Sequence, residues 1–159
     1  MNMSSQWLAA NRERIPEMKR AGYISNDAYA MQNLMESFAE FKPLTPLLHN
    51  IQVPTLILNG EFDFFTPRIC HEILRREISS SRLVIMPNAY HAFTLEMPAL
   101  TLRQIEHFLQ QVTQNQWPGD QSVWIAEENP ESAELLRPFE GDWLRAIPMP
   151  GPSRSQPND

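Results

Sequence analysis

Cysteine is almost absent from this sequence, and glycine is scarce. Cys70 is the only cysteine, and glycine accounts for 5 of the 159 residues. A single cysteine excludes a disulfide within the chain and is typical of proteins from a reducing compartment. We predict that Cys70 is a small buried residue of a helix rather than a catalytic thiol. The sequence also lacks a Gly-rich phosphate-binding loop, so nucleotide-dependent phosphoryl transfer is not expected.

Long apolar runs and a surplus of basic residues are lacking too. No apolar run approaches the ~20 residues that cross a bilayer, and the first residues do not resemble a secretory signal peptide. The formal net charge is −6, which leaves no basic face to neutralise phosphates, so a nucleic-acid partner is not expected. These features together predict a cytoplasmic protein without a membrane span.

The negative charge is concentrated in the last third of the chain. Residues 1–111 carry 10 Lys and Arg against 11 Asp and Glu, whereas residues 112–159 carry 3 against 8 and hold 7 of the 14 prolines. We therefore expect residues 113–159 to form an acidic, Pro-rich tail, either disordered or docked as a strap on another surface. Residues 148–159 are expected to be loose.

Two helices are predicted in the first part of the chain. The first spans about 5–20, and the second begins at Ser25 or Asn26 and ends before Pro43. The second helix carries methionine and aromatic side chains at helical spacing. These side chains either pack in a core or line an apolar substrate channel.

The pattern changes to alternating strands and helices after residue 51. Apolar runs at 55–59 and 82–86 predict two strands covered on both faces. A helix capped by Thr66 follows the first strand, and a helix over about 98–112 follows the second. The last helix has an apolar face, formed by Leu102, Ile105, Leu109 and Val112. This βαβα order predicts parallel strands and a right-handed crossover.

Such a unit is incomplete. Two parallel strands that are apolar on both faces need further strands beside them and helices above and below. Residues 1–111 alone would leave a sheet edge and an apolar face in contact with water. We therefore expect the sheet to be completed by a missing upstream half, by a partner chain or by a homo-oligomer.

An acid and a histidine stand at the ends of the two predicted strands. Asp63 follows the first strand and His91 follows the second, and parallel strands bring their carboxyl ends to the same edge of the sheet. A carboxylate bonded to one imidazole nitrogen leaves the other nitrogen to accept a proton from a hydroxyl or thiol. Glu61 is an alternative acid, although alternation along the strand points it the other way.

The remaining histidines do not predict a metal or cofactor site. His71 and Glu72 begin like a zinc-binding helix, but Arg75 occupies the position of the second histidine. His49 and His107 are expected to be solvated residues at helix ends.

Two local motifs resemble the α/β-hydrolase family. The string Gly60-Glu-Phe-Asp63-Phe-Phe-Thr66-Pro67 is similar to the family's penultimate core strand, which ends in Gly-x-x-Asp-x-x-Thr/Ser-Pro. The string His91-Ala-Phe-Thr-Leu-Glu96-Met-Pro98 is similar to the His-x-x-x-x-Glu-x-Pro run after the last strand. The resemblance implies that Asp63 is the orienting acid and His91 the general base of a Ser-His-Asp triad.

The resemblance also implies a domain organisation and a pocket. Residues 1–50 would be a helical lid, and residues 51–112 the C-terminal βαβα part of the hydrolase core. The catalytic residues would be supported by Gly60, Thr66 and Glu96. A substrate pocket is expected among the apolar residues Met35, Phe38, Phe64, Phe65 and Phe93.

The sequence departs from the family pattern in two ways. Tyr90 precedes the histidine where the family usually has glycine, which would alter the backbone path and access to His91. The nucleophile motif Gly-x-Ser-x-Gly does not occur in the 159 residues. The chain alone therefore holds an acid and a base but no nucleophile for them to serve.

Several functions follow from these observations. The chain is either the C-terminal part of an acyl hydrolase acting on an ester, thioester or amide, or a non-catalytic, hydrolase-like module that binds a partner. A more specific version of the enzyme hypothesis is an acyltransferase that acts on hydroxyacyl chains. A small doubly wound domain of another family is the remaining alternative.

Overall fold

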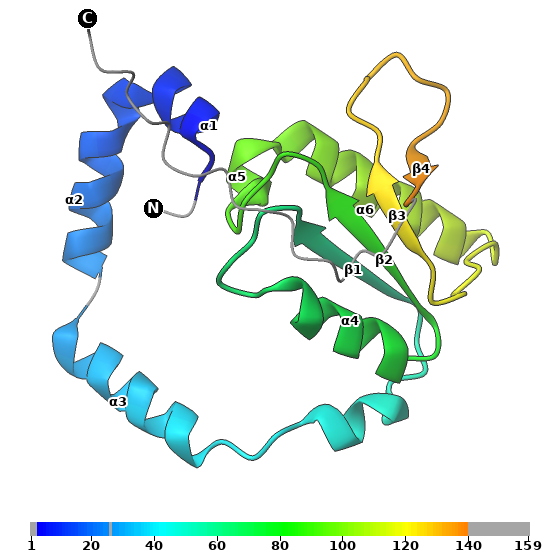
Figure 1. Ribbon diagram of the computed structural model, residues 1–159, viewed down its shortest axis with the longest axis horizontal. Coiled ribbons are helices and arrows are strands. Elements are labelled where there is room, and N and C mark those ends of the chain that lie inside the picture. The colour runs from blue at the N-terminus through cyan, green and yellow to red at the C-terminus, as the bar shows by residue number, and fades with distance from the viewer. Residues whose placement is uncertain (1–2, 26, 140–159) are drawn as a thin grey trace, which may run out of the picture.

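The structure is a computed structural model that describes residues 3–25 and 27–139. Its centre is a four-stranded sheet in the order β1-β2-β3-β4 (Figure 1). The strands are β1 (Thr55–Gly60), β2 (Ser81–Met86), β3 (Val123–Ala126) and β4 (Leu136–Pro138). The first three are parallel and β4 runs antiparallel to β3. The predicted α/β class and the predicted parallel pair are confirmed.

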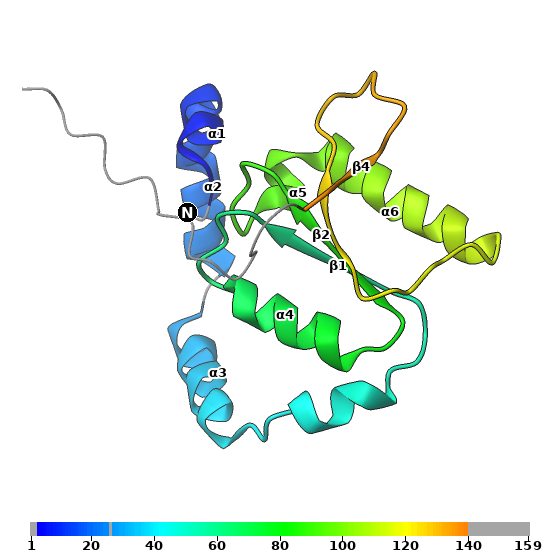
Figure 2. The ribbon, with the colours of Figure 1, turned by 45° about the vertical axis from the view of Figure 1, so that its right-hand side comes forward.

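A helix covers each face of this sheet, as Figures 1 and 2 show. Helix α4 (Arg68–Glu77) contributes Leu74 to one core, and α5 (Phe93–Glu96) and α6 (Pro98–Thr113) cover the other face. The first core is formed by Ile57, Leu83 and Ile85, and the second by Val84, Met86, Ala89 and Ala126. Every residue of β2 is buried, as expected for a strand that is paired on both edges and covered on both faces.

The first fifty residues form a chain of short helices. These are α1 (Ser5–Ala10), η1 (Arg12–Arg14), α2 (Ile15–Ser25), α3 (Ala28–Glu40) and η2 (Thr45–Asn50). The single helix predicted over 5–20 is interrupted at Asn11, whose backbone N–H and side-chain amide both donate to the Trp7 carbonyl, at 3.0 and 2.9 Å. In Figure 1 α2 and α3 form an arc that stands away from the sheet.

The helix caps also differ from the prediction by one or two positions. Ser4 caps α1, because its hydroxyl accepts from the Trp7 N–H at 3.1 Å. Asp27 caps α3 by accepting from the Ala30 N–H at 2.9 Å, and this replaces the predicted start at Ser25 or Asn26. Pro67, rather than Thr66, is the N-cap residue of α4, because the Thr66 side chain is engaged with Asp63.

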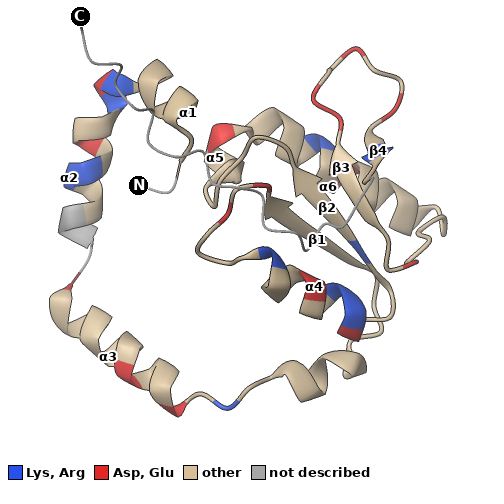
Figure 3. Cartoon of the chain, viewed as in Figure 1, with Lys and Arg blue, Asp and Glu red and all other residues tan. Residues whose placement is uncertain are grey.

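Part of the predicted acidic tail belongs to the sheet. Residues 123–126 form β3, which pairs with β2, so this part of the expected tail is a strand of the sheet. The loop between β3 and β4 holds four acidic residues and projects from the sheet (Figure 3). These residues are Glu127, Glu128, Glu131 and Glu134. Residues 140–159, including the stretch expected to be loose, lie outside the described residues.

Arg82 anchors this added strand. Its buried guanidinium lies over the rings of Trp117 and Trp124, at 5.3 and 5.4 Å from their centroids. It also donates to Asp120 at 3.3 Å. On the other side of the sheet, the Gln121 amide donates to three carbonyl groups at the end of α4, those of Arg75, Arg76 and Ile78. Aromatic stacking on a cation and capping of a helix end therefore hold residues 117–126 against the βαβα unit.

Replacing Trp117 by alanine is expected to lower the free energy of unfolding by about 2 kcal/mol. The half-buried ring packs on Phe108 and Arg82, and truncation of fully buried aromatic residues costs ~3–5 kcal/mol. Urea denaturation of the purified chain measures the difference. A change below ~0.5 kcal/mol would show that residues 117–126 are not docked in solution.

The apolar face of α6 does not pack on the sheet as a whole. Thr101 and Gln104 are the buried residues of this helix, whereas Leu102, Ile105 and Leu109 are exposed. Among the described residues, no helix is both long and apolar enough to cross a bilayer.

Candidate active site

Asp63 and His91 meet at the carboxyl ends of β1 and β2. The register pairs Gly60 with Met86 at these ends, and both loops leave the sheet on the same side. The His91 Nδ1 atom lies 2.9 Å from Asp63 Oδ2. The structure thus brings together the two residues that sequence reasoning selected, across 28 positions of the chain.

Asp63 is held by four hydrogen bonds. The backbone N–H groups of Phe65 and Thr66 donate to Oδ1 at 2.9 and 3.1 Å, and the Thr66 hydroxyl donates to Oδ2 at 2.7 Å. The fourth partner is His91, and the Asp63 side chain is only 2% exposed. Burial raises the pKa of Asp63, but the hydrogen bonds from Thr66, His91 and Phe65 outweigh it and bring the net pKa below its usual value. The carboxylate is therefore ionised and fixed in orientation.

His91 is oriented by Asp63 but open to solvent. Its side chain is 47% exposed, and its ring lies 5.6 Å from the ring of Phe65. Because Nδ1 faces the carboxylate, Nε2 is the nitrogen left to exchange a proton with a reacting group. The pair therefore has the arrangement of an orienting acid and a general base.

Gly60 allows the two loops to approach each other. A Cβ atom at this position would lie 2.2 Å from the Tyr90 carbonyl oxygen and 2.8 Å from that of Ala89. Both atoms belong to the backbone, so neither moves without displacing the loop that carries His91. The glycine is required by this close approach rather than by a positive φ.

Tyr90 is accommodated beside the pair. Its ring contacts Phe62, with centroids 5.7 Å apart, and the hydrogen bond between His91 and Asp63 forms next to it. Glu61 lies apart from this bond, because its carboxylate accepts from the Asn88 N–H at 2.9 Å. The alternative acid is thus engaged in holding the turn before His91.

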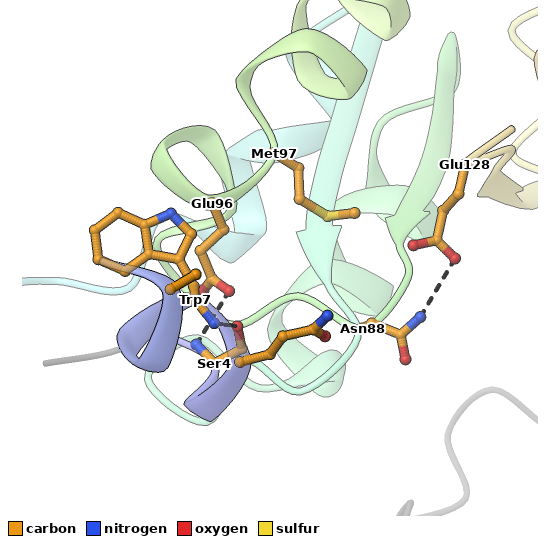
Figure 4. Close-up of a pocket in the computed structure, with 8 residues that line it drawn as sticks. Ser4, Trp7, Asn88, Glu96, Met97 and Glu128 are labelled. Carbon is orange, nitrogen blue, oxygen red and sulfur yellow. Dashed lines mark hydrogen bonds between the residues drawn. The ribbon is translucent and has the colours of Figure 1, made fainter. Parts of the chain in front are cut away.

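Glu96, predicted to support the site, lies against the first helix. Its Oε2 atom accepts from the Ser4 N–H at 3.0 Å. Figure 4 shows this contact at the rim of an open pocket of about 340 Å³. The pocket is lined by Trp7, Asn88, Met97 and Glu128 as well. Sequence reasoning missed it, because its walls come from segments with no common motif.

Most of the residues expected to line a substrate pocket are exposed in the described part of the chain. Met35, Phe38, Phe64 and Phe65 are exposed, and Phe93 packs on the core below α6. None of the five lines the pocket of Figure 4. An apolar substrate channel would need a further surface facing these side chains.

The exposure of two further residues differs from the prediction. Cys70 is exposed on α4 and not buried as predicted. His107 is half-buried rather than solvated, and burial lowers its pKa. His49 is exposed as expected. Among residues 3–25 and 27–139, no group of three His, Cys, Asp or Glu side chains is placed to hold a metal ion.

Replacing Thr66 by valine is expected to cost about 1.5 kcal/mol of stability at pH 7, because a hydrogen bond to a buried charge is lost. The folded-state pKa of Asp63 is lowered, so its ionised form stabilises the fold above the ordinary value of 3.8, and this contribution disappears as the pH falls through the lowered pKa. Urea denaturation at pH 7 and at a pH below 3.8 measures both effects. The difference between the two proteins should shrink at the acidic pH, and a constant difference would contradict the assignment.

The chain is similar in sequence to several named hydrolases. It is 30% identical over 112 residues to the serine hydrolase BPHL of Mus musculus, a match that covers 67% of this chain and 38% of the mouse protein. It is 37% identical over 78 residues to a pimeloyl-acyl carrier protein methyl ester esterase of Neisseria meningitidis, covering 49% of this chain and 28% of the esterase. A proline iminopeptidase of Saccharolobus solfataricus is 36% identical over 69 residues, which are 43% of this chain and 22% of the peptidase.

The chain spans less than two fifths of the length of each of these relatives. No protein-family model matches the chain, and no solved structure matches it significantly. The relatives are hydrolases of the α/β-hydrolase type. Their similarity to this chain supports the hydrolase-type fold that its two motifs and its parallel sheet indicate.

Proposed function

We propose that this chain supplies the acid and the base of a Ser-His-Asp triad in an acyl hydrolase, with Asp63 as the orienting acid and His91 as the general base. The nucleophile would come from outside residues 1–159. The observation that carries the proposal is the 2.9 Å contact between His91 Nδ1 and the buried Asp63 carboxylate, which leaves Nε2 on an exposed ring.

The reaction follows from this geometry. His91 Nε2 takes the proton of a serine hydroxyl while the serine oxygen attacks the carbonyl carbon of the acyl substrate. Asp63 stabilises the imidazolium that results. The imidazolium then gives its proton to the leaving alcohol, thiol or amine, which breaks the old acyl bond and forms an acyl-serine. A water molecule activated by the same imidazole releases the acid and restores the serine.

The substrate class is a small molecule with an ester, thioester or amide bond. The names of the relatives, an esterase, an iminopeptidase and a serine hydrolase, support attack on a carbonyl carbon without selecting one leaving group. An alcohol in place of water in the second step would make the enzyme an acyltransferase. The exposed apolar side chains of α3, among them Met35 and Phe38, support a lid role for residues 1–50 over an apolar acyl group.

The isolated 159-residue chain is expected to hydrolyse a nitrophenyl ester no faster than buffer does, because its sequence holds no Gly-x-Ser-x-Gly nucleophile motif and the Thr66 hydroxyl near His91 donates to Asp63. The protein purified from its source cell is expected to hydrolyse the same ester. Hydrolysis by the isolated chain that survives His91→Ala would mean that the proposed chemistry is wrong. Absence of hydrolysis in the source protein, with a range of esters, thioesters and amides, would favour the non-catalytic, partner-binding reading.

A further inference from the structure

A small cavity lies under α6, at the end of the sheet away from the Asp63–His91 pair. Arg82, the second residue of β2, reaches it from the amino end of that strand. The cavity has a volume of about 10 Å³, which is room for no more than one water molecule. Four polar side chains line it together with apolar ones that include Phe108 and Trp117; the polar residues are Arg82, Gln104, His107 and Gln111. No layer of solvent therefore separates these polar groups.

Arg82 brings a permanent positive charge to this cavity. The residue is 7% exposed, and its guanidinium lies against the rings of Trp117 and Trp124. Its ion pair with Asp120 measures 3.3 Å, and the Asp120 side chain is 43% exposed, so water screens this pair. The Nε atom of Arg82 is buried and has no hydrogen-bond partner among the described residues. A second cation beside this guanidinium would be repelled.

His107 is the titratable neighbour of Arg82 in the cavity. It is half-buried on α6, and burial, followed by the positive charge of Arg82, lowers its pKa below the usual 6.5. Arg103, one turn earlier on α6, is engaged elsewhere, because it donates to the carbonyls of Glu127 and Asn129 in the β3–β4 loop. The side chains that β1 and β4 contribute to the cavity are apolar. The His107 imidazole is therefore neutral at pH 7.

Residues 114–122 connect α6 to β3 (Figure 1) and contribute Trp117 to the wall of the cavity. The Trp117 ring packs edge-on against Phe108 of α6, with centroids 4.7 Å apart. Its indole N–H donates to the Ser80 carbonyl at 3.1 Å. Asp120 of the same segment accepts from Arg82. The segment is thus anchored on the two elements that carry the charged and the titratable group.

We propose that His107 and Arg82 form an acid-sensitive latch, which keeps residues 114–122 docked at neutral pH and loosens them when His107 gains a proton. A protonated imidazole would place a second cation beside Arg82, where there is no room for a layer of solvent. Opening of the segment relieves this repulsion, because both cations then reach water. The latch lies at the far end of the sheet from Asp63 and His91, so it does not depend on the proposed function.

The direction of the pH effect follows from the two states of the segment. In the docked state the pKa of His107 is lowered, and in the released state it returns to its ordinary value of 6.5. Above this value the imidazole is neutral in both states. Below it the released state takes up the proton first, so the ratio of released to docked segment rises by about tenfold per pH unit at most, until the lowered pKa is reached. Burial raises the pKa of Asp120, but its hydrogen bonds with Ser122 and Arg82 bring it below 3.8, so Asp120 stays ionised in this range.

Hydrogen exchange of the Trp117 indole N–H, followed by NMR on the full chain, tests the latch. Protection is the ratio of the intrinsic to the observed exchange rate at the same pH, and it should fall by about three- to tenfold between about pH 7.5 and 5.5. In His107→Gln, which carries no titratable group at this position, it should change by less than about twofold. His71→Gln is the matched control, because burial also lowers the pKa of His71, which lies on α4 at the other face of the sheet. This variant should keep the fall.

No fall in the original protein, or the same fall in His107→Gln, would overturn the latch. An equal fall at the Glu61 N–H, which donates to the Met86 carbonyl at the other end of the sheet, would also overturn it, because the whole chain would then be unfolding. If His107→Gln does not fold, the imidazole titration of His107 in the original protein decides. A titration below 6.5 that coincides with the loss of Trp117 protection supports the latch, and an ordinary titration contradicts it.

Discussion

Under the proposed function, replacing His91 by alanine in the complete protein is expected to lower kcat/KM for ester hydrolysis by about 10⁴-fold or more. The His91 imidazole is the base that is hydrogen-bonded to the buried carboxylate of Asp63. Without it, the proton of the nucleophile has no acceptor in position. Its loss should change the free energy of unfolding by no more than about 1 kcal/mol, because the side chain is half exposed and Asp63 keeps its hydrogen bonds from Phe65 and Thr66.

Two further variants make this test specific. Asp63→Asn should also reduce kcat by about 10⁴-fold, because an amide fixes the wrong tautomer and does not stabilise the imidazolium. His49→Ala removes an exposed histidine remote from the pair and should leave activity unchanged. Activity of the His91 variant within tenfold of the original protein, measured with nitrophenyl esters, would remove the triad assignment.

Replacing Gly60 by alanine is expected to destabilise the chain by about 3 kcal/mol and to impair the acid–base pair. The new methyl group would lie 2.2 Å from the Tyr90 carbonyl oxygen, so the loop that carries His91 must move. Overpacking of this kind costs ~1–3 kcal/mol, and a 1 Å displacement of a catalytic group costs ~10²-fold in rate. Urea denaturation and ester hydrolysis measure the two effects.

Gly22 provides the matched control for this substitution. It lies inside α2, and a Cβ atom there has nothing within 4 Å. Gly22→Ala should therefore leave stability unchanged or raise it by up to ~1 kcal/mol, as expected for glycine replaced within a helix. If the two alanine variants unfold at the same urea concentration and turn over substrate equally, Gly60 is not needed to position His91.

The Asp63–His91 pair could be predicted from the sequence, whereas the strand and side chains around it could not. Asp63 and His91 directly follow apolar strand runs, and parallel pairing alone places such residues side by side. The added strand β3 was not predicted, because its few residues lie in acidic, Pro-containing sequence that resembles a tail. Its position depends on Arg82 between Trp117 and Trp124, a contact between residues far apart in the chain that no local pattern reports.

The apolar face of α6 illustrates a second limit. Periodicity correctly indicated an amphipathic helix, but Thr101 and Gln104 face the sheet while Leu102, Ile105 and Leu109 are exposed. A periodic pattern shows that a helix has an apolar face, but it does not show which surface covers that face. The same holds for Met35 and Phe38, whose exposed side chains match the expected pocket in composition but have no facing wall in the described part of the chain.

Labelling of the native protein with a fluorophosphonate probe tests the central claim most directly. The probe reacts with a serine that an adjacent base activates, and mass spectrometry identifies the labelled residue. We predict that the labelled serine lies outside residues 1–159, in the species that contains this chain, and that His91→Ala abolishes its labelling. Absence of labelling in that species, or labelling that is unchanged by His91→Ala, would contradict the claim that Asp63 and His91 serve a nucleophile supplied from elsewhere.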